Sequence, residues 1–329
     1  MYERFYGLRE RPFSLTPDPR YVVLTDAHRE AITNIEYGIA GRHGITLLIG
    51  QAGSGKTTVI RYAIERQPPT VHCVHLRNPA LTRTEFIEML AATFDLSARA
   101  STSKTALLLE LEAVLRARHE ANESSVLIVD EAQSLPIDLL EEIRLLANIE
   151  TNDTKLLSVV LAGQPELAER LEDPSLRQLK QRVALRCELR ALTYAETSNY
   201  LASRIHSAGG VPGQAFSLEA VMRIHDVSGG VPRTINVLAD NALLNGLAAN
   251  QRPVTRRIVE EVCRDFLLKP SEPVALPAVQ HAAAEPLSSV AHSTPASTSG
   301  AQAHEPDQPM FASMNTPRRF SLSFWKGGR

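Results

Sequence analysis

The sequence predicts an α/β protein in which helices flank a parallel β-sheet, followed by a small all-helical subdomain and a disordered tail. Short apolar runs alternate with helical patterns in the first part of the chain, only helical patterns follow Leu192, and composition changes sharply at Pro270. We expect four regions: residues 1–44 as an amino-terminal linker and helix, 45–191 as the core, 192–268 as a helical lid, and 269–329 as the tail.

Five apolar runs have the composition of strands buried in a parallel sheet. They are Ile45–Ile49, Val71–Leu76, Ser125–Val129, Leu156–Ala162 and Val183–Leu189. Apolar residues at helical spacing lie between them, in Lys56–Arg66, Thr84–Phe94 and Ala106–His119. Since parallel strands need crossover connections, usually helical, this alternation favours a parallel sheet covered on both faces.

The helical subdomain is predicted to open at a capping box formed by Thr193 and Glu196, with a helix running to about Ala208. Gly209-Gly210 ends that helix. Further helical patterns cover Leu218–Val227, Pro232–Leu247 and Thr255–Leu267.

Composition excludes several classes of protein. The 329 residues are 43% hydrophobic and 22% charged, which is enough to bury a core. The formal net charge of −2 argues against a protein that mainly coats DNA. The three cysteines, Cys73, Cys187 and Cys263, are an odd number spaced far apart, so reduced thiols are expected. The run His72–His75 has no second ligand pair nearby, which argues against zinc.

Targeting signals are also not evident in the sequence. No run approaches the roughly 20 uncharged apolar residues of a membrane span. The first six residues, Met1–Tyr6, carry charge and aromatic rings where a signal peptide needs an apolar stretch. We therefore expect a cytoplasmic protein.

The tail holds 8 of the 20 prolines and shows no sustained periodicity, which predicts disorder. Its end, Arg318–Lys326, places aromatic residues between positive charges and includes the only tryptophan. Two interpretations stay open: a docking peptide for a partner or an anionic membrane surface, or simply an unstructured end.

The segment Gly50–Thr57 matches the phosphate-loop pattern G-x-x-x-x-G-K-[ST]. Glycines let backbone N–H groups point at phosphate oxygens, and the following helix aims its positive end at them. Lys56 is expected to neutralise the β- and γ-phosphates, and the Thr57 hydroxyl to bind Mg²⁺. The residues predicted to contact ATP are Gly50, Gln51, Ala52, Gly53, Ser54, Gly55, Lys56, Thr57 and Thr58.

Two carboxylates follow the third predicted strand. Asp130 is expected to hold Mg²⁺, and Glu131 to orient or deprotonate the attacking water. Taken alone, the pair would be read as a polar turn, but downstream of a phosphate loop the catalytic interpretation is favoured.

Three weaker elements have both a catalytic and a structural interpretation. Gln164 follows the fourth strand and could contact the γ-phosphate or the water. Arg177 and Arg182 precede the fifth strand, where an arginine could reach the nucleotide of a neighbouring subunit. Arg233 opens a helix of the second subdomain and could sense the γ-phosphate. Taken singly, each is better explained as a surface or structural residue, and it is their order along the chain that favours the catalytic interpretation.

The order of these elements resembles the AAA+ ATPases. A narrower resemblance links the chain, over about residues 1–268, to the ExeA/GspA group of secretion-pathway ATPases, which includes MshM-like members. The strings that carry it are Tyr6–Phe13, Pro17–Pro19, Asp130–Leu135, Leu140–Thr151, Gly163–Leu167 and Ser228–Asn236. The resemblance implies the roles given above for Lys56, Thr57, Asp130, Glu131, Gln164 and Arg233. It also makes Arg182 the preferred arginine finger and Arg177 the second choice.

This resemblance implies Mg-dependent ATP hydrolysis that drives assembly or remodelling of a bacterial envelope complex for secretion, pilus formation or exopolysaccharide export. It also implies a homo-oligomer and an envelope or inner-membrane partner, with the tail as one route of contact. The protein would then be cytoplasmic or peripheral at the inner membrane. Fuller members carry a membrane span and a peptidoglycan-binding domain, which this sequence does not show, and that difference argues against direct cell-wall binding.

Two other functions stay open at this point. A DNA-associated regulator of the TniB transposition type shares the same core, and its phosphate contacts would come from basic stretches. Those stretches contain Arg177, Lys180, Arg182, Arg186 and Arg190, and then Arg252, Arg256 and Arg257. A nucleotide switch without turnover is the third function, although Glu131 argues against it.

The resemblance to AAA+ proteins also implies that the segment Pro12–Tyr21 packs beside the adenine.

Overall fold

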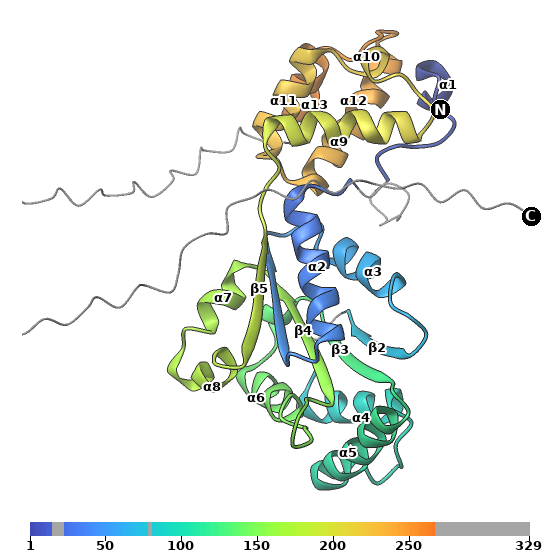
Figure 1. Ribbon diagram of the computed structural model, residues 1–329. Helices are drawn as coiled ribbons and strands as arrows, with labels where there is room; N and C mark the ends of the chain where they lie inside the picture. Colours follow the sequence, from blue (N-terminus) through green and yellow to red (C-terminus); the bar gives the residue numbers. More distant parts are fainter. Residues whose placement is uncertain (15–22, 78–80, 267–329) are drawn as a thin grey trace, which may run out of the picture. The chain divides into compact units, whose positions relative to one another are not determined.

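The computed structural model describes residues 1–14, 23–77 and 81–266 (Figure 1). The predicted tail, its aromatic end and residues 15–21 of the expected adenine-binding segment lie outside the described residues.

A five-stranded sheet with the strand order β2-β3-β4-β1-β5 forms the core of the fold. All four strand pairs are parallel, which confirms the predicted α/β class. The strands begin and end within one residue of the predicted ranges. They are β1 (Ile45–Gly50), β2 (Val71–Leu76), β3 (Ser124–Val129), β4 (Leu157–Gly163) and β5 (Val183–Leu189).

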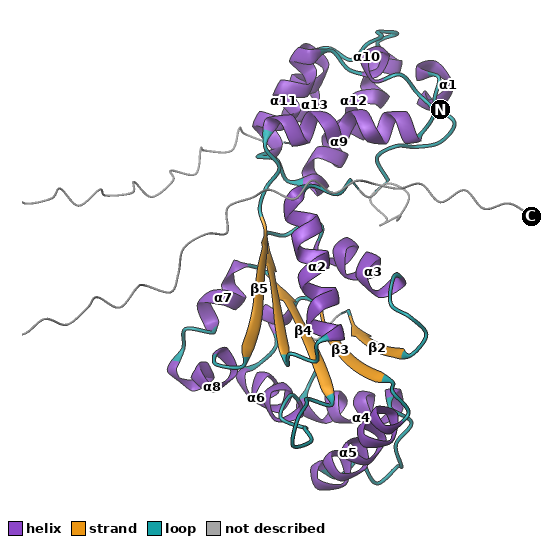
Figure 2. Cartoon of the chain, viewed as in Figure 1, coloured by secondary structure: helices purple, strands orange, loops and turns teal. Residues whose placement is uncertain are grey.

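Helices pack on both faces of this sheet (Figure 2). Each face of the sheet has its own core cluster. Because side chains alternate along a strand, Val126 and Ile128 of β3 belong to one cluster and Leu127 and Val129 belong to the other. The first cluster includes α2 (Asp26–Ala40) and α3 (Lys56–Glu65). The second includes α4 (Arg83–Thr93), α5 (Lys104–Glu120), α6 (Ile137–Leu146), α7 (Pro165–Arg170), the 3₁₀ turn η3 (Pro174–Leu176) and α8 (Arg177–Lys180).

The edge strands β2 and β5 are less buried than the three central strands. In β5, exposed residues alternate with more buried ones over most of the strand, whereas every residue of β1 and β4 is buried. The alternation visible in the sequence of Val183–Leu189 therefore reflects the edge position of this strand.

A third core cluster lies in the helical part of the chain that follows the sheet. It is built from α9 (Tyr194–Ser207), α10 (Pro212–Ala215), α11 (Leu218–Ser228), α12 (Pro232–Ala248) and α13 (Arg256–Asp265). The predicted capping box is present at the start of α9, where the backbone N–H of Glu196 donates to Thr193 Oγ1 at 3.2 Å and the backbone N–H of Thr193 donates to Glu196 Oε2 at 2.8 Å.

The amino-terminal residues pack into this helical cluster. The short helix α1 (Tyr2–Tyr6) contributes two buried tyrosines, and Phe13 lies edge-on against Phe216 with ring centroids 6.0 Å apart. Phe13 is 1% exposed. This part of the expected adenine-binding segment is thus committed to a hydrophobic core. Among the described residues, no helix combines the length and apolarity that crossing a bilayer requires.

Candidate nucleotide-binding site

The predicted site residues gather at the carboxyl edge of the sheet. The phosphate loop follows β1, Gln164 follows β4, and Asp130 and Glu131 follow β3. Since β4 lies between β1 and β3, these three strand ends are adjacent. Ligands of open parallel sheets bind at this carboxyl edge, so the topology brings the loop, the amide and both acids together where a nucleotide can reach them.

The phosphate loop depends on glycine at three positions. Gly53 and Gly55 have φ angles of +80° and +103°, in the region that side chains disfavour. A Cβ atom on Gly50 would lie 2.5 Å from Ser54 Oγ. Helix α3 begins directly after Gly55, which offers no side-chain cap, so its first N–H groups remain available to an anion. The buried Ser54 hydroxyl also has no hydrogen-bond partner within the described part of the chain.

Lys56 is held inside the loop. Its side chain is buried, and Nζ donates to the carbonyl oxygens of Gly50 at 2.9 Å and Gln51 at 3.2 Å. Burial lowers the pKa of Lys56, while the negative charges of Glu131 and Asp130 oppose that shift. A bound triphosphate would add negative charge beside Nζ, so it favours the ammonium form.

Thr57 and Asp130 form the pair expected to hold Mg²⁺. The Thr57 hydroxyl donates to Asp130 Oδ2 at 2.6 Å, and Asp130 Oδ1 accepts from the backbone N–H of Glu131 at 3.0 Å. Asp130 is only 2% exposed. A hydroxyl and a carboxylate are the hard oxygen ligands that Mg²⁺ prefers, so this donor set fits the ion.

Glu131 adopts a left-handed backbone conformation with φ 55° and ψ 36°. Non-glycine residues rarely adopt this region, and such strain is found preferentially at functional sites. Two amides hold its carboxylate: Gln133 Nε2 donates to Oε2 at 2.6 Å and Gln164 Nε2 donates to the same oxygen at 3.3 Å. Gln164 therefore contacts the predicted base directly.

Arg233 lies beside the phosphate loop although it is far away in sequence. Its backbone N–H donates to the Gly53 carbonyl at 3.2 Å. A Cβ atom on Gly53 would come within 2.6 Å of Arg233 Cβ, which shows how closely the start of α12 approaches the loop. The Arg233 side chain is exposed.

Arg182 lies at the amino ends of the strands, opposite to the carboxyl ends where the phosphate loop begins. It directly precedes β5, whose first residue pairs with Ile45 at the start of β1. Residues Ile45–Ile49 of β1 separate this end from the phosphate loop, which begins at Gly50, and they span about 16 Å at roughly 3.3 Å per residue. Arg182 therefore cannot reach the phosphate loop of its own chain, and neither it nor Arg177, exposed at the start of α8, joins the gathered residues.

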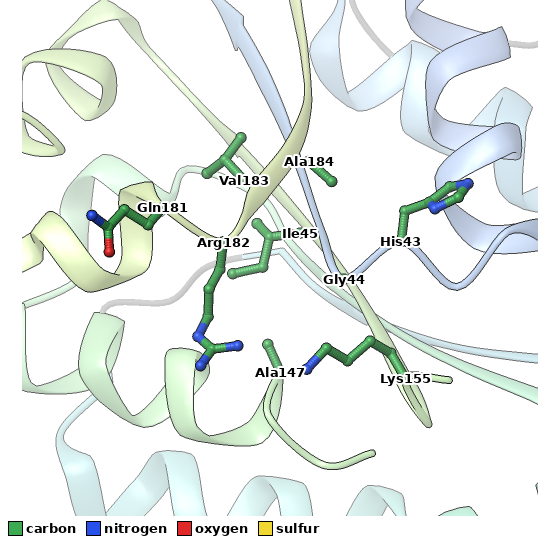
Figure 3. Close-up of a pocket in the computed structure, with 9 residues that line it drawn as sticks. All are labelled: His43, Gly44, Ile45, Ala147, Lys155, Gln181, Arg182, Val183 and Ala184. Carbon is green, nitrogen blue, oxygen red and sulfur yellow. The ribbon is translucent and has the colours of Figure 1, made fainter. Parts of the chain in front are cut away.

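Arg182 lines a pocket of about 280 Å³ at this amino edge (Figure 3). The other lining residues are His43, Gly44, Ile45, Ala147, Lys155, Gln181, Val183 and Ala184. Figure 3 shows the Arg182 and Lys155 side chains converging near Ala147. Lys155 forms an ion pair with Glu150, and this hydrogen bond, followed by the charges of Lys155 and Arg182, lowers the pKa of the Glu150 carboxyl.

Two residues at the site were missed by sequence reasoning. Gln133 belongs to the run Asp130–Leu135 that supports the family resemblance, but the pattern assigns it no role. His28, in the first turn of α2, has Nε2 3.1 Å from a Cβ built on Gly55, and its other ring nitrogen lies 2.6 Å from Thr25 Oγ1. Burial lowers the pKa of His28 and favours the neutral ring. No local pattern in the sequence marks a histidine that approaches the loop from another helix.

The sequence of this chain also matches a known domain family and a known protein. Residues 39–171 match the AAA domain family. General secretion pathway protein A of Aeromonas hydrophila is 38% identical over 254 residues, which cover 77% of this chain and 46% of that protein. The chain therefore spans a little under half the length of this relative.

Solved structures share the fold at low sequence identity. The ORC2 protein of Aeropyrum pernix has a TM-score of 0.57 at 18% identity, covering 78% of this chain and 71% of that chain. Drosophila ORC has a TM-score of 0.57 at 19% identity, covering 79% and 65%. By its fold and its AAA domain, the chain is a nucleotide-binding AAA+ ATPase. Within that class, the similarity to general secretion pathway protein A supports the ExeA/GspA-like resemblance that the sequence motifs predict.

Proposed function

We propose that this chain binds Mg-ATP at the carboxyl edge of its sheet and hydrolyses it within a homo-oligomer, and that this cycle assembles or remodels a bacterial envelope complex. The observation that carries the proposal is the meeting of three adjacent strand ends. They bear the phosphate loop with Thr57, the acids Asp130 and Glu131, and Gln164. These are the groups that phosphoryl transfer to water requires.

The chain's own residues divide the reaction between them. The loop N–H groups and Lys56 bind the triphosphate, for which Nζ exchanges the carbonyls of Gly50 and Gln51 for phosphate oxygens. Thr57 and Asp130 would hold Mg²⁺, which when bound would supply positive charge beside the phosphates. Glu131 takes a proton from the attacking water as the bond from Pγ to the bridging oxygen breaks and ADP leaves.

Gln164 and Arg233 complete the site in this proposal. Gln164 already contacts Glu131, and in this proposal it also contacts the γ-phosphate or the attacking water. Arg233 enters from the helical subdomain, which we assign as a lid over residues 192–268, with residues 45–191 as the catalytic core. The hydrogen bond from the Arg233 backbone N–H to the Gly53 carbonyl links the lid directly to the phosphate loop.

The position of Arg182 supports hydrolysis within an oligomer. Because this arginine lies at the opposite edge from its own phosphate loop, it can stabilise transition-state charge only on the nucleotide of a neighbouring copy. The pocket that it shares with Lys155 would then face that neighbour.

The envelope role rests on the similarity to general secretion pathway protein A, and it implies a peripheral position at the inner membrane. The DNA-binding alternative gains no support from the fold. Several basic residues of its two stretches are engaged in ion pairs, and these pairs reduce the charge available for phosphates. The pairs are Lys180–Glu172, Arg190–Glu196, Arg256–Glu260 and Arg257–Glu261.

Phosphate release from Mg-ATP tests the hydrolytic part. Glu131→Gln and Arg182→Ala should each abolish turnover while ATP still binds. Mixing the two inactive proteins should restore activity, because some interfaces then combine Glu131 of one copy with Arg182 of another. No recovery on mixing, with oligomers present, would refute the shared site. In cells, a chromosomal Glu131→Gln replacement should block assembly of the envelope complex, and normal assembly would refute that role.

A further inference from the structure

We infer that Gln133 is a positioning residue that fixes the carboxylate of Glu131 and couples it to Gln164. The inference deepens the proposed ATP hydrolysis and rests on it. It is carried by the hydrogen bonds around the short 3₁₀ turn η2 (Ala132–Ser134), which directly follows Glu131.

The side-chain amide of Gln133 bridges two strand ends. Its Oε1 accepts the backbone N–H of Gln164 at 3.1 Å, and its Nε2 donates to Glu131 Oε2 at 2.6 Å. A backbone N–H can only donate, so it fixes which end of the amide is the oxygen. The nitrogen must therefore face the Glu131 carboxylate. The backbone N–H of Gln164, at the end of β4, therefore orients the Gln133 amide so that its nitrogen donates to Glu131, at the end of β3.

The bridge is held from both sides. The Gln133 carbonyl accepts a hydrogen bond from Arg170 of α7, so the main chain of the turn is tied to the helix that follows β4. A Cβ atom on Gly163 would lie 3.0 Å from Gln133 Oε1. Glycine at the end of β4 therefore lets the Gln133 amide approach the strand closely.

The result is an asymmetric carboxylate. Within the described residues, the hydrogen bonds to the Glu131 side chain come from the amides of Gln133 and Gln164, and both reach Oε2. The Oε1 atom remains available to accept a proton from water. Glu131 sits in a strained left-handed conformation, so it needs such external contacts to keep one orientation.

This arrangement predicts a specific kinetic defect. Gln133→Leu removes a hydrogen bond to a charged group, and since such bonds contribute about 1.5–3 kcal/mol, kcat should fall about 10- to 100-fold. Affinity for ATP should be unchanged, because Gln133 is not among the residues of the phosphate loop. Gln133→Glu tests the same point with the shape kept: its carboxylate can still accept from the Gln164 N–H, but when ionised it cannot donate to Glu131.

The experiment measures phosphate release, ATP affinity and thermal unfolding for the full chain, for both variants and for Ser134→Ala. Ser134 is the matched control, since its hydroxyl donates at 2.8 Å to the backbone carbonyl of Glu131 and not to the carboxylate. We expect a loss of kcat in both Gln133 variants, with unchanged ATP affinity, and activity close to that of the parent in Ser134→Ala.

Different results overturn different claims. If the parent chain releases no phosphate, the proposed hydrolysis and this inference both fail. If the parent is active and both Gln133 variants keep its kcat, only the role of Gln133 is refuted. A loss of kcat that comes with weaker ATP affinity would show a merely structural role and would likewise overturn the inference.

Discussion

Replacing Gly53 by alanine should weaken the contact between the helical subdomain and the phosphate loop. A Cβ atom at this position would lie 2.6 Å from Arg233 Cβ and 3.3 Å from Val231 Cγ1, where ordinary contacts begin at 3.4 Å. The start of α12 must therefore move away by about 0.8 Å, the difference between 3.4 and 2.6 Å. The same movement stretches the hydrogen bond from the Arg233 N–H to the Gly53 carbonyl, which is already 3.2 Å long.

The magnitude follows from these two contacts. A lost backbone hydrogen bond costs about 0.5–1.5 kcal/mol, and overpacking costs about 1–3 kcal/mol. A net penalty of about 2 kcal/mol on the docked arrangement corresponds to about 30-fold. The strain of alanine at φ +80° is present whether or not the subdomain is docked, so it lowers stability without changing the docking equilibrium.

Calorimetric titration with a non-hydrolysable ATP analogue and with ADP measures this effect. Affinity for the analogue should fall about 30-fold, and affinity for ADP should fall less, because Arg233 is proposed to sense the γ-phosphate. Gly213→Ala in α10 is the matched control, since a Cβ there meets no atom within 4 Å. If Gly53→Ala binds the analogue and hydrolyses ATP like the parent, the contact between Arg233 and the loop has no part in nucleotide binding.

Three further predictions concern separate parts of the chain. Because burial lowers the pKa of Lys56 and a triphosphate favours its ammonium form, ATP affinity should be full below the pKa of free Lys56 and should fall as the pH rises above it. Titrations at increasing alkaline pH check this, and an affinity independent of pH would contradict it. Asp130→Asn should weaken the Mg²⁺-dependent part of ATP binding by about tenfold or more but leave binding in EDTA unchanged; equal losses with and without the metal would remove Asp130 from the metal site. Phe13→Ala should cost about 3–5 kcal/mol in urea unfolding, because Phe13 is packed in the helical core, and a loss below about 1 kcal/mol would argue against that packing.

Local patterns in the sequence predict much of this fold. Buried parallel strands are continuous apolar runs, and their range and order along the chain match the observed β1–β5 closely. The phosphate loop is equally local, because the loop motif, the strand before it and the helix after it are contiguous. Helix α6 was not predicted, although Leu139, Leu140, Ile143 and Leu146 mark a buried helical face.

The remaining features depend on tertiary contacts that leave no local trace. Strand order decides that Gln164 meets Glu131 and that Arg182 lies at the other edge of the sheet, and no periodicity encodes strand order. Gln133 becomes significant only when its amide is seen to join two strand ends. The placement of Phe13 and of the buried tyrosines of α1 in the helical core is likewise a contact between distant parts of the sequence.

The most direct test of the central claim is a calorimetric titration of Mg-ATP into the folded chain and into its Lys56→Ala variant. The geometry of the phosphate loop predicts saturable binding of one nucleotide per chain and loss of that binding in the variant. If folded parent protein does not bind Mg-ATP, or if Lys56→Ala binds it with unchanged affinity, the phosphate loop is not the nucleotide site and the proposed function is wrong.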